Sequence, residues 1–338
     1  MRKLGLALLI LIVALSSVNA SAGSYDDYRY FLPSTKVPDA GKLLSGQRLS
    51  KTLIVNLDSG ISERYFDVNR DRTIYQAWRL SRYPAPWDDF GHGTKVQYVI
   101  DAVLASSGIS DEKGVSPVQT ITYKMNDHRG KSTANGLIEA LNDIIDNFVV
   151  KNGWPVAAVN FSSSLSFNLK VPGAKEERRR LQDALNRLRE HGVTFVTASG
   201  NENGPISADL QLMSNVIVVG ATDRSNDRGT WKDDAGNRLG SNYGPNLDLV
   251  APGVDVMIGE RRQSYRWGNG TSYAAPQVTA AIALMRALNP KLTPDRIESL
   301  LKTSAKDLGA KKRDDMYGYG LLDAKKTLGS VISGLNDQ

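Results

Sequence analysis

One serine of the chain lies between a glycine-rich turn and a predicted helix, where a nucleophile would be useful. The stretch around it reads Gly268-Asn269-Gly270-Thr271-Ser272-Tyr273-Ala274-Ala275-Pro276, and a helical pattern of small and apolar residues continues to Leu284. The Ser272 hydroxyl would be accessible, and the positive end of the helix would stabilise an oxyanion formed beside it. The same stretch fits an N-cap serine that only closes a loop, so other groups must decide between the two.

A serine nucleophile needs a base, and histidine is the side chain whose pKa suits that role. The chain has three histidines. His191 precedes a glycine that ends a predicted helix, and His128 lies in a polar turn, so we expect structural roles for both. His92 lies between two glycines at the start of a predicted helix, where its ring is uncrowded. We therefore interpret His92 as the base.

The base needs a carboxylate that fixes its tautomer. Asp58 follows the apolar run from Lys51 to Leu57, which predicts a buried strand with the acid at its carboxyl end. Asp88 and Asp89 compete for this role, but we expect both to be exposed on a loop. Asp-Ser/Thr-Gly also marks aspartic proteases, which need two such carboxylates, and this chain contains the motif once.

The order of the three groups separates the classes of serine hydrolase. Asp58, His92 and Ser272 follow one another along the chain. An α/β-hydrolase has its histidine after the serine, and no histidine follows Ser272. The chymotrypsin order puts histidine before aspartate, whereas Asp–His–Ser is the order found in subtilisin.

From about Lys51 to about Leu328 the chain resembles the subtilisin-like serine proteases, or subtilases. The resemblance is carried by Asp58-Ser59-Gly60, Gly91-His92-Gly93-Thr94 and Gly270-Thr271-Ser272-Tyr273-Ala274-Ala275-Pro276. It implies Ser272 as nucleophile, His92 as general base and acid, and Asp58 as the orienting carboxylate. It also implies that Asn201, in Ala198-Ser199-Gly200-Asn201, donates to the oxyanion together with the Ser272 backbone N–H. The plainer interpretation of Asn201 is an asparagine of a turn.

The resemblance also places a substrate-binding segment at residues 159–164, which would pair with a peptide as an added strand. The substrate-binding residues that it implies are Ser162, Ser163, Ser164, Ser199 and Gly200. Subtilases usually have glycine where Ser164 falls. A side chain there would narrow the pocket for the residue before the cleaved bond. We therefore expect a preference for smaller residues, or an unusual pocket.

Some positions depart from the subtilase pattern. Lys95 stands where another histidine is common, and Gln97 and Tyr98 replace small residues, which we expect to crowd the start of the helix that carries His92. Tyr273 replaces a common methionine. Residues 23–50 leave no room for a domain-sized propeptide, so the domain folds unaided or needs a separate folding helper or inhibitor. We expect no required cofactor and assign no metal ligand; a structural calcium is possible but unassigned.

The composition is that of a globular protein and not of a disordered or membrane-embedded one. The 338 residues are 41% hydrophobic and 23% charged, which is typical of a globular protein, and there is no cysteine. Residues 1–22 combine Arg2 and Lys3 with an apolar run and small residues around Ala20 and Ala22, which predicts a signal peptide and export, secreted or periplasmic. The apolar run from Leu4 to Leu15 is too short to favour a membrane-spanning helix, so we expect no stable membrane insertion. The net charge of +6 is spread among acids, so we expect no nucleic-acid partner.

Short apolar strands alternate with helices throughout the chain. This pattern predicts an α/β fold with a mostly parallel sheet and helices on both faces, in one domain. We expect an extended N-terminal arm at residues 23–50, a catalytic domain at 51–330 and a C-terminal tail at 331–338. The prediction for function is an exported serine endopeptidase acting on protein or peptide substrates. The alternative is a catalytically silent subtilase-like binding protein.

Overall fold

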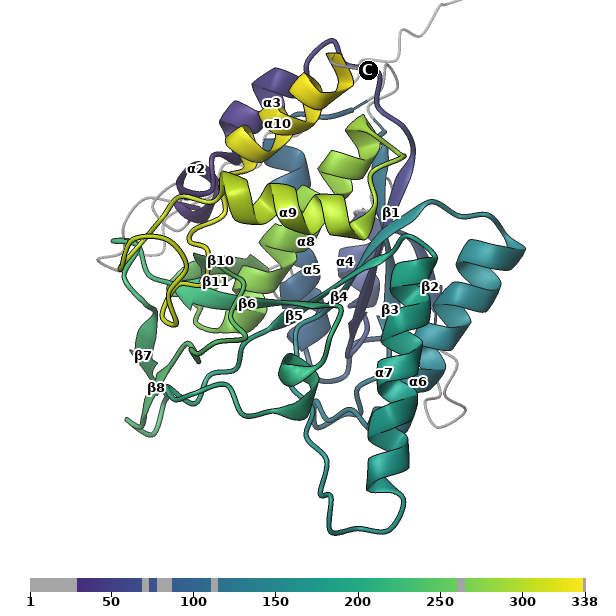
Figure 1. The fold of residues 1–338 in the computed structure, drawn as a ribbon, viewed down its shortest axis with the longest axis vertical. Helices are drawn as coiled ribbons and strands as arrows, with labels where there is room; N and C mark the ends of the chain where they lie inside the picture. Colours follow the sequence, from purple (N-terminus) through teal and green to yellow (C-terminus); the bar gives the residue numbers. More distant parts are fainter. Residues whose placement is uncertain (1–28, 69–72, 78–86, 111–114, 260–264, 337–338) are drawn as a thin grey trace, which may run out of the picture.

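A parallel sheet forms the centre of the computed structural model, which describes residues 29–68, 73–77, 87–110, 115–259 and 265–336 (Figure 1). Seven strands run in the order β2-β3-β1-β4-β5-β6-β9, and every neighbouring pair is parallel. The strands are β1 (Thr52–Asp58), β2 (Thr73–Ala77), β3 (Val118–Lys124), β4 (Val156–Phe161), β5 (Thr194–Ala198), β6 (Val216–Thr222) and β9 (Leu249–Pro252). Their near-continuous apolar runs are typical of strands covered on both faces.

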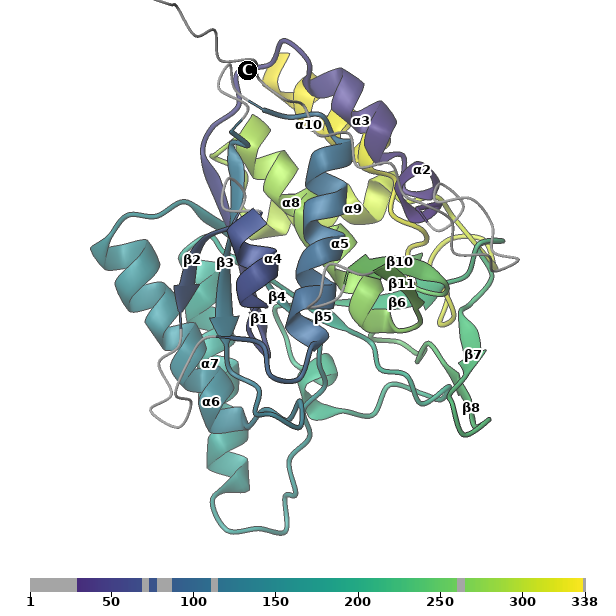
Figure 2. The same cartoon turned by 180° about the vertical axis from the view of Figure 1, so that it is seen from behind.

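Helices cover both faces of the sheet (Figures 1 and 2). Helices α5 (His92–Ser106) and α8 (Thr271–Leu288) pack on one face, and α6 (Ala134–Asp143), the π-helix η1 (Ile144–Lys151) and α7 (Ala174–Glu190) pack on the other. The alternation along β1 follows this division, because Ile54 faces the first group while Leu53 and Val55 face the second. The predicted fold class, a single α/β domain with helices on both faces, is confirmed.

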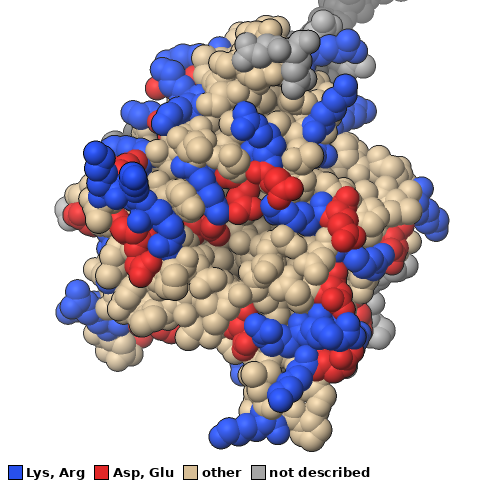
Figure 3. Space-filling model, in the orientation of Figure 1, with Lys and Arg blue, Asp and Glu red and all other residues tan. Residues whose placement is uncertain are grey.

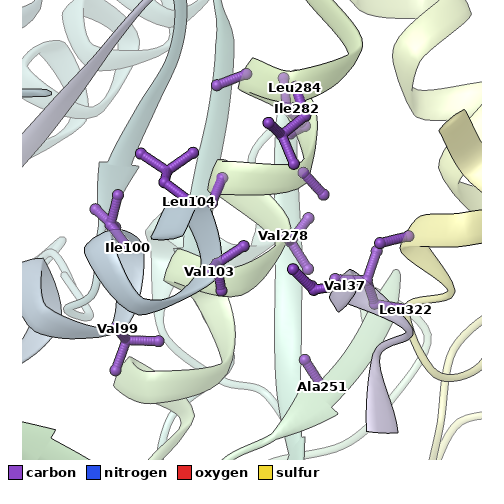
Figure 4. Packing of buried hydrophobic residues seen from close by; sticks show 14 of the residues in the cluster. Val37, Val99, Ile100, Val103, Leu104, Ala251, Val278, Ile282, Leu284 and Leu322 are labelled. Carbon is purple, nitrogen blue, oxygen red and sulfur yellow. The ribbon is translucent and has the colours of Figure 1, made fainter. Parts of the chain in front are cut away.

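Helix α8 is buried on nearly every side. All of its residues except Arg286 are buried, and its many alanines let the sheet and α5 approach it closely. Figure 4 shows Val278 and Ile282 of α8 among Val103 and Leu104 of α5. A helix that is apolar all round belongs in the interior of a domain, so its position is set by packing from several sides.

The N-terminal segment is helical, so the prediction of an extended arm is wrong. Helices α2 (Phe31–Ser34) and α3 (Val37–Leu44) lie beside the C-terminal helix α10 (Ala324–Asn336) in both views. In α3, the buried side chains recur at Val37, Ala40 and Leu44, which places them on one helical face. The expected tail at 331–338 is also corrected, because α10 continues to Asn336 and Val331 is buried.

The other elements lie around this core. Thr133 and Thr293 cap α6 and α9 (Pro294–Ser304), since each side chain accepts a backbone N–H of the first turn. Helix α4 (Glu63–Val68) and β2 follow β1 along the chain. The remaining elements are the 3₁₀-helix η2 (Asp209–Leu212) and the hairpins β7 (Thr230–Lys232)–β8 (Arg238–Gly240) and β10 (Val256–Gly259)–β11 (Tyr265–Gly268).

The surface carries mixed charges. Lys and Arg are interspersed with Asp and Glu over the face in Figure 3, and Arg179 of the basic run on α7 pairs with Glu176 and Asp183. Among the described residues, no helix is long and apolar enough to cross a membrane. The predicted signal peptide at 1–22 lies outside the described residues.

The buried N-terminal helices lead to a stability prediction. Phe31 is fully buried in the cluster that also contains α8. Replacing it by alanine removes a buried ring and leaves a cavity, so Phe31→Ala should lower the free energy of unfolding by about 3–5 kcal/mol. Denaturant unfolding, measured in a Ser272→Ala background that removes the predicted nucleophile, tests this.

Lys42→Ala on the same helix pair is the matched control. The Lys42 side chain is 78% exposed, so its removal should change stability by no more than about 0.5 kcal/mol. A loss for Phe31→Ala as small as that of the control would show that α2 does not stabilise the domain.

Candidate active site

Asp58 and His92 meet at the carboxyl edge of the sheet. Asp58 is the last residue of β1, which has β3 and β2 on one side and β4 on the other. The chain goes from β1 to β2 and β3 and then crosses to β4 on the opposite side. Ligand sites of open α/β sheets lie outside such a point. His92 Nδ1 lies 2.9 Å from both carboxylate oxygens of Asp58. Because a carboxylate only accepts hydrogen bonds, Nδ1 carries the proton, and Nε2 of the neutral ring is free to accept one.

The site is enclosed on the Asp58 side and open on the His92 side. Asp58 is 2% exposed, and its Oδ1 also accepts the Ser59 backbone N–H at 2.7 Å. The His92 side chain is 23% exposed. Its ring centroid lies 6.3 Å from that of Tyr273 and 6.5 Å from that of Phe90. The contact with Tyr273 brings the start of α8 beside the histidine.

Ser272 lies in the first turn of α8, where it is 8% exposed. The Ser162 hydroxyl donates to the Ser272 carbonyl at 3.0 Å, which fixes the backbone of this turn. A methyl group built on Gly270 would lie 3.1 Å from Ser272 Oγ and 3.8 Å from the Ser272 nitrogen. Glycine at position 270 therefore leaves open the space directly beside the hydroxyl.

Asn201 borders the same space. Its Oδ1 accepts the Thr271 backbone N–H at 3.0 Å and the Thr271 hydroxyl at 2.9 Å. Since a backbone N–H can only donate, Oδ1 must be the atom that faces Thr271, and the amide Nδ2 is directed away from it. Nδ2 has no hydrogen-bond partner within the described part of the chain, and it lies 3.8 Å from the same built methyl position on Gly270. The Ser272 hydroxyl, the Ser272 nitrogen and Asn201 Nδ2 thus all lie within 4 Å of one position beside Gly270.

The predicted substrate-binding residues occupy different environments. The Ser162 and Ser199 side chains are buried, and the Ser199 hydroxyl donates to the Asn242 carbonyl at 3.2 Å, so only their backbones could contact a substrate. Ser163 is half-buried and Ser164 is exposed. Gly200 has φ +107°, and a Cβ there would lie 2.3 Å from Asn242 Nδ2, so only glycine fits. Their role in substrate binding stays a prediction.

Gln97 and Tyr98 do not distort the start of α5, contrary to our expectation of crowding. Gln97 is fully buried and donates to Asp101 at 3.0 Å. The Tyr98 ring lies against Gly259 of β10, where a Cβ would be 2.7 Å from the ring. The space for the larger side chain therefore comes from a glycine on the neighbouring hairpin.

Asp88 is the site residue that sequence reasoning misjudged. We expected it to be exposed, but it is 4% exposed and accepts hydrogen bonds from the first turn of α5. Its neighbour Asp89 is 46% exposed and forms an ion pair with Lys124 at 2.9 Å. An acid shortly before a helix start is a known N-terminal signal, and this signal could have indicated that Asp88 faces the helix.

The pKa of His92 reflects opposing effects. Burial, the largest effect, disfavours the imidazolium and lowers the pKa, as does the nearby charge of Lys95. The charge of Asp58, its hydrogen bond to the ring and the charge of Asp88 raise it, and together they prevail. The pKa of His92 is therefore raised above its usual value of 6.5.

No group of three or more histidines and acids that could hold a metal ion occurs within the described residues. The arrangement at the edge of the sheet thus consists of a carboxylate, an imidazole, a hydroxyl and N–H donors. These are the groups that acyl transfer through a serine requires.

The model of one protein family, described as the subtilase family, matches residues 50–320. The chain belongs to the subtilase family of serine-type endopeptidases. Subtilisin Savinase of Lederbergia lenta is 33% identical to this subtilase over 244 residues, which are 72% of this chain and 79% of that protein. The minor extracellular protease Epr of Bacillus subtilis is 29% identical over 275 residues, which are 80% of this chain and 38% of that protein.

The fold agrees with a solved structure, a lanthipeptide protease. The two superpose with a TM-score of 0.70 over 90% of this chain and 95% of that one, at 21% sequence identity. At this identity the likeness bears on the fold alone, and it supports the subtilisin-like arrangement of sheet and helices described above.

The opposing charges around His92 lead to a titration prediction. NMR titration of the three histidines, in a Ser272→Ala variant, should give His92 a pKa above 6.5. Lys95→Gln should raise it further, because removing a positive charge favours the imidazolium. If His92 acts as the predicted base, it must be neutral, so activity should rise as the pH rises through this raised pKa.

Lys311→Gln serves as the control for Lys95→Gln, because Lys311 is an exposed lysine in the loop before α10. It should leave the His92 titration unchanged. A His92 pKa at or below 6.5, or a fall on removing Lys95, would contradict the balance of charges described here.

Proposed function

We propose that this subtilase is an exported endopeptidase that cleaves peptide bonds through an acyl-enzyme. Ser272 is the nucleophile, His92 the general base and then the acid, and Asp58 the carboxylate that orients His92. The observation that carries the proposal is the shared space beside Gly270, bordered by Ser272 Oγ, the Ser272 N–H and Asn201 Nδ2. Such a space, close to a nucleophile and to two donors, is where the oxyanion of acyl transfer would form.

The proposed reaction assigns a step to each of these groups. Ser272 Oγ bonds to the carbonyl carbon of the substrate while His92 Nε2 takes the hydroxyl proton, and the carbonyl electrons move onto oxygen. Asn201 Nδ2 and the Ser272 N–H hold this oxyanion. Its collapse breaks the C–N bond, and the proton passes from His92 to the leaving amine. A water molecule then repeats the sequence on the acyl-enzyme and releases the acid.

The proposed steps use side chains, backbone donors and water. Asp58 stays ionised throughout, and its contact with Nδ1 stabilises the imidazolium. Hydrolysis by this route therefore requires no cofactor.

Export is supported by two features. The apolar run and basic residues at 1–22 fit a signal peptide, and the names of two relatives include the word extracellular. One is Epr of Bacillus subtilis, and the other is an extracellular protease of Xanthomonas campestris that is 29% identical over 206 residues, covering 58% of this chain and 34% of that protein.

The proposed roles of Ser272 and Asn201 lead to a labelling and rate prediction. The wild-type protein should react with a fluorophosphonate, and Ser272→Ala should not. Asn201→Ala should still be labelled but should hydrolyse a peptide with kcat lower by about 10²–10³, the loss known for one such donor in a subtilisin. Labelling is read by mass spectrometry and hydrolysis with a fluorogenic peptide.

Asn203→Ala, in the same loop, is the control for Asn201→Ala. Its Oδ1 accepts from Arg228 at 2.8 Å, so it acts in the loop and not in the proposed oxyanion site. Labelling that persists in Ser272→Ala, or a wild-type protein that is never labelled, would refute the nucleophile and favour a silent binding protein.

The exposed Ser164 leads to a specificity prediction. We propose that its side chain narrows the pocket for the residue before the cleaved bond, so that small residues are preferred there. Ser164→Gly should raise kcat/KM for large aromatic residues at that position relative to alanine. Competition between peptides that differ only there measures the ratio, and Ser166→Gly, at an exposed position two residues on, is the control. A wild-type profile already dominated by large aromatic residues would exclude the proposal.

A further inference from the structure

We propose that Asp88 is a positioning residue of this site. Its buried carboxylate joins the loop after Asp58 to the first turn of α5, and so sets how the His92 ring meets Asp58. The inference rests on the proposed function, because it assigns a role within that catalytic machinery. Asp88 acts through its neighbours, because its hydrogen bonds reach Ser59 beside Asp58 and the residues on either side of His92.

Both oxygens of Asp88 are saturated with donors from two segments. Oδ1 accepts the Ser59 hydroxyl at 2.8 Å, the Phe90 N–H at 3.2 Å and the Gly91 N–H. Oδ2 accepts the Thr94 N–H at 2.9 Å and the Thr94 hydroxyl at 2.5 Å. One carboxylate thus holds the residue that follows Asp58 and the residues on either side of His92.

Two hydroxyls extend these contacts in both directions. Ser59 Oγ, which donates to Asp88, accepts the Gly93 N–H at 2.9 Å. Thr94 Oγ1, which also donates to Asp88, accepts the Ser62 N–H at 3.0 Å. The loop at 59–62 and the helix turn at 91–94 are therefore linked through Asp88 and by these two bonds, with Asp58 and His92 at the facing ends of the two segments.

A carboxylate suits this position better than an amide. Five donors approach the two oxygens, and a carboxylate can accept hydrogen bonds at both of them. In Asp88→Asn, one oxygen becomes an NH₂ group that faces N–H or O–H donors, so part of the linkage is lost at little change in size. The substitution also removes a negative charge, and that charge is one of the causes that raise the pKa of His92.

The simpler role is a helix cap that only stabilises α5. A cap would be worth about 0.5–2 kcal/mol of stability, and its loss would leave the turnover of the folded enzyme unchanged. Removing the Asp88 charge shifts the His92 titration in either case, so the two roles differ in kcat and not in stability or pH dependence.

The experiment compares Asp88→Asn, Ser59→Ala and Asp89→Asn with the wild type. Each is assayed for kcat and KM on a fluorogenic peptide, normalised to fluorophosphonate-labelled sites, and for the pH dependence of kcat/KM. Asp88→Asn should lower kcat by about tenfold to 10²-fold, since small misplacements of catalytic groups have effects of that size, with KM nearly unchanged. The acid limb of its pH profile of kcat/KM should move to lower pH. The reason is that the His92 pKa falls, so the imidazole stays neutral at lower pH.

Ser59→Ala separates the effect of the Asp88 hydrogen bonds from the effect of the Asp88 charge. It is a small change, so it still tests the positioning role if Asp88→Asn fails to fold. It removes the link to the Asp58 loop but keeps the Asp88 charge, so kcat should fall while the acid limb stays in place. Asp89→Asn removes a carboxylate from the same loop but leaves the linkage intact, so it should keep both kcat and the limb.

An unchanged kcat in both Asp88→Asn and Ser59→Ala, whatever their unfolding midpoints and pH profiles, would reduce Asp88 to a cap and overturn the proposal. The His92 pKa measured by NMR in a Ser272→Ala background needs no turnover. It therefore tests the effect of the Asp88 charge on His92 even in an inactive protein, whereas the positioning role is tested by kcat. A wild-type protein that is never labelled would count against the proposed function, and a labelled wild type with unchanged kcat in both variants would count against the role of Asp88 alone.

Discussion

The site depends on a close approach between a strand end and a helix start, and a glycine makes this approach possible. A Cβ on Gly93 would lie 2.2 Å from the Gly60 carbonyl oxygen and 3.1 Å from Asp58 Cβ. No side chain fits there without separating α5 from the loop that follows β1. The hydrogen bonds between His92 and Asp58 follow from this contact, and α5 in turn forms one wall against which α8 packs.

Two glycines of the hairpin β10–β11 allow it to pack closely against both α5 and α8. Tyr98 of α5 lies against Gly259, and Tyr273 of α8 lies against Gly268, where a Cβ would be 2.7 Å from each ring. Each aromatic ring takes the space that a side chain on the hairpin would otherwise fill. Tyr98, on the helix that carries His92, and Tyr273, next to the proposed nucleophile, are thus placed against one hairpin, although both depart from the usual subtilase pattern.

Much of this architecture could be predicted from the sequence, because it depends on local patterns. The apolar run before Asp58 and the glycines around His92 indicated a strand end and a helix start, and the chain order restricted the class of site. Asp88 was misjudged because its burial depends on Ser59 and Thr94, which lie on two segments that only the fold brings together. The helix α3 was missed because eight residues carry too little periodicity to separate a helix from an arm.

Buried polar side chains fix the position of α8 along and around its axis, which apolar packing alone would leave free. The alanine-rich surface of α8 is smooth, so packing alone would tolerate small shifts of Ser272 along or around the helix axis. Asn160 of β4 removes this freedom: it accepts the Thr279 hydroxyl of α8 at 3.1 Å and donates to Asn56 of β1 at 3.0 Å. It also donates at 3.1 Å to the Ser162 hydroxyl, which holds the Ser272 carbonyl. Hydrogen bonds are directional, and in a dry interior they specify one arrangement. Through Asn160 they therefore hold β1, which ends in Asp58, and α8, which carries Ser272, in fixed positions relative to each other.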